Sequence, residues 1–222
     1  MRPQELMPRA DRHVSENVFD YRHDIIRFSI GRDGHLFLTI DLPNLPDTYV
    51  TAHDAPTYER GGFIPSGSLQ FIKKHKLKVL EVGAGINGFI TEVHKPMIID
   101  PLPYDTVDQA LLEGFRYAPN PTSKQAIEIL RRRIAFITNP QKAYLIPMTL
   151  EAAYESHRDL IKAWGPDIVV DINGAGIYGD QRRVFQYETD LLPDTNPHRI
   201  WSNGQTVGGK FYTTSIENLG LV

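Results

Sequence analysis

The segment from Lys78 to Phe89, KVLEVGAGINGF, constrains the fold of this chain more than any other. Residues 79–82 are apolar except for Glu81 and lack the alternation of a half-exposed strand, as is typical of strands buried on both faces. A glycine-rich bend follows directly, and we expect a short helix over residues 86–94 after it. A buried strand that leads through a glycine bend into a helix predicts an α/β protein with a mostly parallel sheet.

The rest of the chain repeats this alternation of apolar runs and helical periods. One expected helix begins near Ser66 or Ser68, either of which can cap it, and ends in KKHKLK. Further helices are expected over residues 106–137, with a break at APNPTS, and over 150–164 and 180–191. Further strands are expected over residues 96–100, 142–148 and 167–172, and near 198–204 and 210–217. This order predicts helices on both faces of the sheet.

The amino-terminal part of the chain has a different pattern. Two β-rich runs flank Asp33-Gly34, which suits a tight turn, so residues 24–41 predict a β-hairpin. We expect a frayed terminus up to Ser15 and an irregular connection from Pro43 to Pro65. Residues 1–65 are therefore interpreted as an extension, and residues 66–222 as the ligand-binding domain. The hairpin could cap the site or pair with a second copy in a homodimer. The aromatic residues of the connection suit either a flap over the site or packing against the hairpin: Tyr49, Tyr58 and Phe63.

Composition excludes several classes of function. The 222 residues contain no cysteine, which rules out disulfides, thiolate nucleophiles and cysteine-bound metals. The histidines show no metal-binding spacing, and we expect no metal site. A net charge of −3 gives no general reason to expect nucleic acid as a partner, and the basic runs KKHKLK and LRRRI are interpreted as solvated helix faces. No apolar run is long enough to cross a membrane and no secretory signal precedes the fold, so we expect a cytoplasmic protein.

In a parallel sheet of this kind, ligands bind beyond the carboxyl ends of the strands, where the strand order reverses. Residues 83–88, Asp100, residues 147–149 and residues 171–173 should therefore face one crevice. Gly83, Gly85 and Gly88 fit the pattern G-x-G-x-x-G, in which missing Cβ atoms let a ligand lie against the backbone. A helix that starts at this bend would also offer its first N–H groups, which lack partners within the helix, to an anion.

Two acids distinguish between the candidate ligands. Glu81 lies at the end of a buried strand, where a carboxylate is costly without a partner. A cationic amino group would supply that partner, whereas the pyrophosphate of a dinucleotide would be repelled. Asp100 closes the next strand, where an acid can hold the hydroxyls of a ribose. A ligand with an amino-acid head and a ribose is S-adenosylmethionine.

The segments VLEVGAGINGF and MIIDP resemble the first two motifs of the class I S-adenosylmethionine-dependent methyltransferases, which have a Rossmann-like fold. The resemblance covers residues 69–177 and implies that S-adenosylmethionine is the cofactor. It implies Asp100 and Pro101 at the ribose, and Met148 and Thr149 at the adenine. Asp171 and Asn173 would lie beside the transferable methyl group. The methionyl part would be surrounded by residues of the bend and the strand before it: Glu81, Gly83, Ala84, Gly85, Asn87 and Gly88.

We therefore expect methyl transfer to an oxygen or nitrogen nucleophile, with a small molecule as the acceptor. His94 is a candidate base by its location, and Asp171 and Asn173 are the other candidate catalytic residues. The glycine spacing leaves an NAD-dependent oxidoreductase open. The displaced third glycine, the short first helix and the long connection after Asp100 leave a non-catalytic protein of the same fold open. Simple turns also remain possible at Gly83–Gly88, Asp100 and Asp171–Asn173, and Glu81 could pair with an arginine or a backbone amide.

Overall fold

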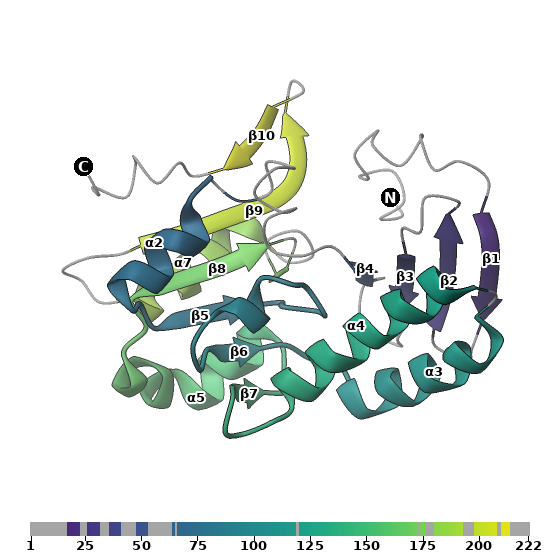
Figure 1. Ribbon diagram of the computed structural model, residues 1–222. Helices are drawn as coiled ribbons and strands as arrows, with labels where there is room; N and C mark the ends of the chain where they lie inside the picture. The colour runs from purple at the N-terminus through teal and green to yellow at the C-terminus, as the bar shows by residue number, and fades with distance from the viewer. Residues whose placement is uncertain are drawn as a thin grey trace.

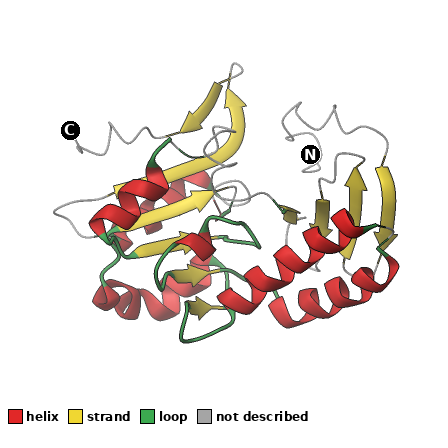
Figure 2. Cartoon of the chain, viewed as in Figure 1, coloured by secondary structure: helices red, strands yellow, loops and turns green. Residues whose placement is uncertain are grey.

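The protein is described by a computed structural model, in which two sheets are seen. The described residues are 17–22, 26–31, 36–40, 48–52, 64, 66–118, 120–172, 174–175, 180–192, 198–207 and 210–213. Figure 2 shows the two sheets as two separate sets of yellow strands, with the helices in red around them. The expected α/β fold with a mostly parallel sheet and an amino-terminal hairpin is confirmed.

The larger sheet has the strand order β10-β9-β8-β5-β6-β7. Strands β5 to β9 run parallel, and only β10 is antiparallel to its neighbour. The chain passes from β5 to β6 and β7 on one side and then crosses to β8 on the other, so the strand order reverses between β5 and β8 (Figure 1). The strands are β5 Val79–Val82, β6 Met97–Ile99, β7 Tyr144–Ile146, β8 Ile168–Ile172, β9 His198–Val207 and β10 Lys210–Thr213.

Helices cover both faces of this sheet. Helix α2 (Ser68–His75) buries Ile72 with Val79 and Val170 on one face. Helices α5 (Leu150–Trp164) and α7 (Gln181–Leu191) bury Ile161 and Val184 with Leu80 on the other. Alternate residues of β5 therefore face opposite layers, which explains why the whole strand is buried. Among the described helices, none combines the length and the apolar character needed to span a membrane.

The smaller sheet is antiparallel, with the order β1-β2-β3-β4. Its central pair, β2 (Ile26–Gly31) and β3 (Leu36–Ile40), is the expected hairpin, although the turn at Asp33-Gly34 lies outside the described residues. Strands β1 (Asn17–Arg22) and β4 (Thr48–Thr51) flank the hairpin and were not expected from the sequence. The prediction of an irregular Pro43–Pro65 connection is wrong over β4, because Thr48–Thr51 pairs with β3. The terminus up to Ser15, Tyr58 and Phe63 lie outside the described residues.

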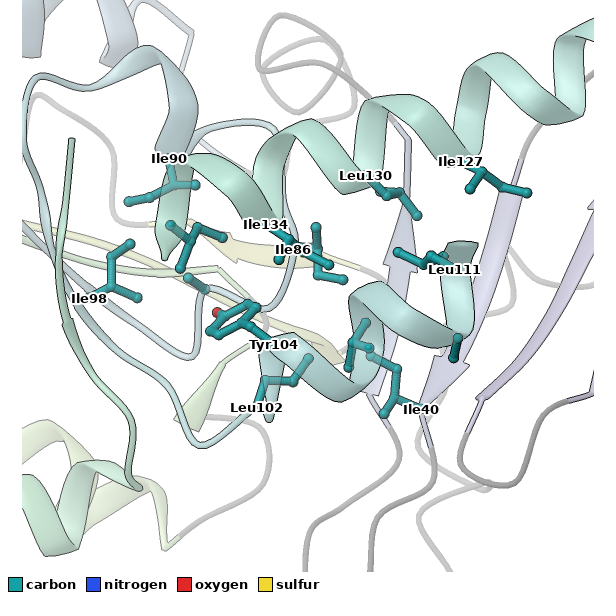
Figure 3. Close-up of a cluster of buried hydrophobic side chains, with 14 of the residues drawn as sticks. Ile40, Ile86, Ile90, Ile98, Leu102, Tyr104, Leu111, Ile127, Leu130 and Ile134 are labelled. Atoms are coloured by element: carbon teal, nitrogen blue, oxygen red, sulfur yellow. The ribbon is translucent and has the colours of Figure 1, made fainter. Parts of the chain in front are cut away.

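The long connection between β6 and β7 forms two helices, α3 (Tyr104–Tyr117) and α4 (Pro121–Ile137). Asn120 caps α4 by accepting a hydrogen bond from the Ser123 N–H, and Pro121 suits its first turn. The two helices share a buried cluster with Ile40 of β3 (Figure 3). The inserted helices therefore connect the smaller sheet to the larger one, and the sequence-based boundary at residue 65 passes through a shared core.

Two local predictions are wrong. Gly67, in a left-handed conformation with φ 82°, precedes α2, and no serine side chain caps that helix. The helix expected over residues 86–94 is only a 3₁₀ helix of three residues, Ile90–Glu92. It ends because Val93 is extended and Lys95 has a positive φ of 46°, neither of which continues a helix.

Truncation of the shared cluster tests its contribution to stability. Leu130 is fully buried on α4, so Leu130→Ala should lower the free energy of unfolding by about 2 to 5 kcal/mol. Leu160→Ala is the matched control, because this leucine is 58% exposed on α5 and should change stability by no more than about 0.5 kcal/mol. Urea denaturation measures both, and equal effects of the two variants would contradict the shared core.

Candidate functional site

Three buried acids lie at the carboxyl ends of neighbouring strands. Glu81 is on β5, Asp171 is on β8, and Asp100 follows β6. Besides burial, the negative charges of Asp100 and Asp171 both raise the pKa of Glu81, so both acids act on it. Since β5 and β8 flank the point where the strand order reverses, the acids occupy the position where sheets of this kind bind ligands.

Glu81 is the least satisfied of these acids. Its Oε1 accepts a hydrogen bond from the side-chain amide of Asn87, whereas its Oε2 has no hydrogen-bond partner among the described residues. Burial, together with the charges of Asp100 and Asp171, raises the pKa of Glu81 to about 8. The carboxyl group is therefore mainly protonated at neutral pH, and a cation placed beside Oε2 would favour the charged form.

Asp100 connects the glycine bend to the loop after β6. Its Oδ2 accepts from the Gly85 N–H at 2.6 Å, and its Oδ1 accepts from the Leu102 N–H at 2.7 Å. The Leu102 contact is the local turn that the sequence left open for this aspartate. Burial raises the pKa of Asp100 to about 6, although both backbone contacts oppose the shift. The Tyr104 side chain also acts on this carboxyl and opposes the rise of its pKa.

The absence of a side chain at Gly83 is required by a contact within the protein. Gly83 has a positive φ of 65°, and a Cβ atom on it would lie 2.5 Å from the Cα of Gly174. A Cβ atom on Gly174 would overlap the carbonyl oxygen of Val82. The Gly174 N–H also donates to Asp171 Oδ1 at 2.8 Å. The two glycines therefore let the ends of β5 and β8 approach backbone to backbone, which places Glu81 and Asp171 near one another.

The glycine bend is held by its own side chains. Asn87 Oδ1 accepts from the N–H groups of Phe89 and Ile90, which starts the 3₁₀ helix. The same residue donates to Glu81 and to the Ala84 carbonyl at 2.9 Å. Ile86, Phe89 and Ile90 are fully buried. Asn87 therefore connects the acid to the bend, and no α-helix starts here to present free N–H groups to an anion.

The other predicted site residues have mixed positions. Ala84 and Gly88 are buried in the bend, and Pro101 is half-buried beside Asp100. Thr149 caps α5 by accepting from the Ala152 N–H, and Met148 packs between β7 and α5. His94 lies before β6 and is exposed at the opposite end of that strand from Asp100, so the structure does not bring it to the acids. Asn173 lies outside the described residues.

Two residues next to the site carry no motif in the sequence. Tyr104 donates from its hydroxyl to the Gly85 carbonyl at 2.8 Å, and burial raises its pKa well above the usual value. Arg133 is buried and donates to the carbonyls of Ile86 and Ala52 at 3.1 and 3.0 Å. The interpretation of LRRRI as a solvated face is therefore wrong for Arg133. The sequence could have indicated this burial, because Arg133 falls at a helical position on the apolar face of α4.

The comparisons with known proteins give no family for this chain. No protein-family model matches it, and a search of curated proteins gives no match. Within the described ranges, no three His, Asp or Glu side chains come together in a way that could hold a metal ion.

The backbone contact between Gly83 and Gly174 predicts that alanine lowers the free energy of unfolding more at position 83 than at position 67. Gly83→Ala should cost the left-handed backbone penalty of about 1 to 2 kcal/mol. It should also cost about 1 to 3 kcal/mol for the overlap with Gly174. Gly67→Ala is the control, since Gly67 has a φ of 82° but nothing within 4 Å of the added Cβ. Equal losses in urea denaturation would show that the backbone contact is unimportant.

The raised pKa of Glu81 predicts a pH dependence of stability. Between pH 4.5 and about 8 the folded protein holds a proton at Glu81 that the unfolded chain releases, so stability falls as pH rises through this window. Glu81→Gln should remove a slope of up to about 1.4 kcal/mol per pH unit, best measured above pH 6, where Asp100 contributes little. Glu92→Gln makes the same change at an exposed acid and serves as the control. Parallel stability curves for the wild type and Glu81→Gln would contradict this assignment.

Proposed function

We propose that this chain binds S-adenosylmethionine at the three-acid site and transfers its methyl group to an oxygen or nitrogen nucleophile of a small molecule. The observation that carries the proposal is Glu81 Oε2, a buried acceptor without a partner in the described structure, beside the reversal of the strand order. The amino group of the ligand would supply the missing partner. Asp100 and Pro101 would lie at the ribose, and Met148 and Thr149 at the adenine.

The arrangement also fits the charge of this ligand. Its amino group and sulfonium are both cationic, and Glu81, Asp100 and Asp171 place three carboxyl groups at neighbouring strand ends. Methyl transfer breaks the bond from sulfur to the methyl carbon and forms the bond from that carbon to the acceptor, which loses a proton. Positioning and exclusion of water supply most of such a rate enhancement, so the protein needs a shaped site more than a strong base.

An NAD-dependent oxidoreductase is less consistent with this geometry. Dinucleotide sites place the pyrophosphate at the start of an α-helix after the glycine bend. Here the bend leads to a 3₁₀ helix of three residues, and the Gly85 N–H donates to Asp100 instead. The negative charges of Asp100 and Asp171 would also repel a pyrophosphate.

Binding of S-adenosylhomocysteine, the demethylated product, should release a proton. At about pH 6.5 the amino group of the ligand is charged, while Glu81 with its pKa of about 8 is still protonated. An ion pair between them requires Glu81 to lose its proton. Calorimetry in two buffers of different ionisation enthalpy should give close to one proton released per ligand for the wild type and close to none for Glu81→Gln.

Titrations with S-adenosylhomocysteine and NADH, together with a search for methylated product, distinguish the alternatives. Absence of binding at millimolar S-adenosylhomocysteine would end the proposal, and enhanced NADH fluorescence would favour an oxidoreductase. Binding without any methylated product from a panel of small acceptors would favour a non-catalytic protein. Binding with no proton release would show that Glu81 does not hold the amino group.

A further inference from the structure

A second surface lies at the opposite edge of the larger sheet, at the amino ends of its strands. Lys78 directly precedes β5, Lys95 lies two residues before β6, and Tyr144 opens β7. Trp164 ends α5 close to the start of β8. In Figure 1 the arrows of β5, β6 and β8 all point away from this edge, so the surface is separated from the three acids by the length of the strands.

The four residues form one continuous row, here called the lysine–aromatic row. The Lys95 ammonium lies 4.7 Å from the centre of the Tyr144 ring. The Tyr144 and Trp164 rings meet edge to face, with their centres 6.3 Å apart. The Lys78 ammonium lies 5.8 Å from the Trp164 ring and donates to its carbonyl at 2.9 Å. Two cations therefore border two aromatic rings, and Tyr144 is 40% exposed.

Further positive charge surrounds this row. Lys74, Lys76 and Lys142 are exposed and lie within a few residues of Lys78 or Tyr144 along the chain. Two acids also lie here: Glu92 pairs with Lys73 at 2.7 Å, and Asp167 accepts from the Lys78 backbone N–H at 2.8 Å. The charge of Glu92 is balanced by Lys73, and Asp167 is a single negative charge beside the lysines named above, so this edge keeps an excess of positive charge.

Two of these lysines have an unusual backbone. Lys76 and Lys95 are the non-glycine residues with positive φ in the described structure, at 53° and 46°. Lys76 is the left-handed C-cap of α2, where its N–H donates to the Ile72 and Lys73 carbonyls. Lys76 and Lys95 lie in the two loops that lead into β5 and β6.

We propose that the lysine–aromatic row binds single-stranded nucleic acid. Proteins that bind single strands combine a positive surface for the phosphates with aromatic rings on which bases stack. Lysines alone would suit any polyanion, but the exposed Tyr144 ring and the half-buried Trp164 ring beside them favour a ligand that has both phosphates and flat bases. The sequence by itself favours a solvated helix face for KKHKLK, because the net charge of the chain is negative. This surface does not involve Glu81, so the proposal is independent of cofactor binding.

Fluorescence anisotropy with labelled oligothymidylate and oligouridylate of about 16 nucleotides tests the proposal. At low salt we expect saturable binding to the wild-type protein, with an affinity that falls as salt rises. Tyr144→Ala should weaken binding at least about fivefold through lost stacking. Lys78→Gln with Lys95→Gln should reduce the slope of log affinity against log salt by about 0.7 for each lysine.

Matched controls and a conservative variant keep the test decisive. Tyr117→Ala removes an aromatic ring that is 64% exposed on α3, and Lys124→Gln removes the cation beside Phe115; neither should change binding. Tyr144→Leu keeps an apolar side chain but removes the stacking ring, so it should bind as weakly as Tyr144→Ala. Absence of binding at low salt would overturn the proposal. So would equal binding of a polyglutamate peptide with no dependence on Tyr144, which would indicate an acidic protein partner.

Discussion

The burial of Glu81 at the end of β5 is the constraint on which the rest of the site depends. A fully buried carboxyl with one oxygen unpaired in the described structure is costly, and two further acids close by increase that cost. An apolar residue of similar size would pack the strand end more stably. The bend is built around the acid: Asn87 holds one oxygen of Glu81, while Asp100 holds the Gly85 amide. This cost is the reason why we propose that a cationic ligand group pairs with Glu81.

The sequence predicts the local elements of this fold well. The α5 helix and the buried strands β5, β6 and β8 lie where the sequence predicts them. Each of these elements is determined by the local pattern of its own apolar residues. The element after the bend is the exception. Its residues have a helical period, but Asn87 caps the chain into a short turn and Phe89 and Ile90 pack into the core. Tertiary burial outweighs local preference there.

Contacts between distant residues could not be read from the sequence. Gly83 fits a ligand-binding pattern, yet its missing Cβ is required by Gly174, which lies far along the chain. The sequence predicts that Glu81, Asp100 and Asp171 lie at one edge of the sheet only because each is at the carboxyl end of a strand. That the carboxyl ends form the binding edge is a general property of the fold. Which of their oxygens are occupied depends on backbone amides of the loops, such as that of Leu102, and no residue pattern specifies this.

The buried guanidinium of Arg133 gives the amino-terminal sheet a physical connection to the site. It reaches from α4 to the carbonyl of Ala52, directly after β4, and to the carbonyl of Ile86 within the glycine bend. A guanidinium is planar and keeps its donors in a fixed geometry, so both carbonyls must hold their positions together. The bend that bears Asn87 is therefore positioned from two sides, by Asp100 at the end of β6 and by Tyr104 and Arg133 from the helical insertion. A chain of contacts therefore runs from Ala52 through Arg133 to Ile86, whose neighbour Asn87 donates to Glu81.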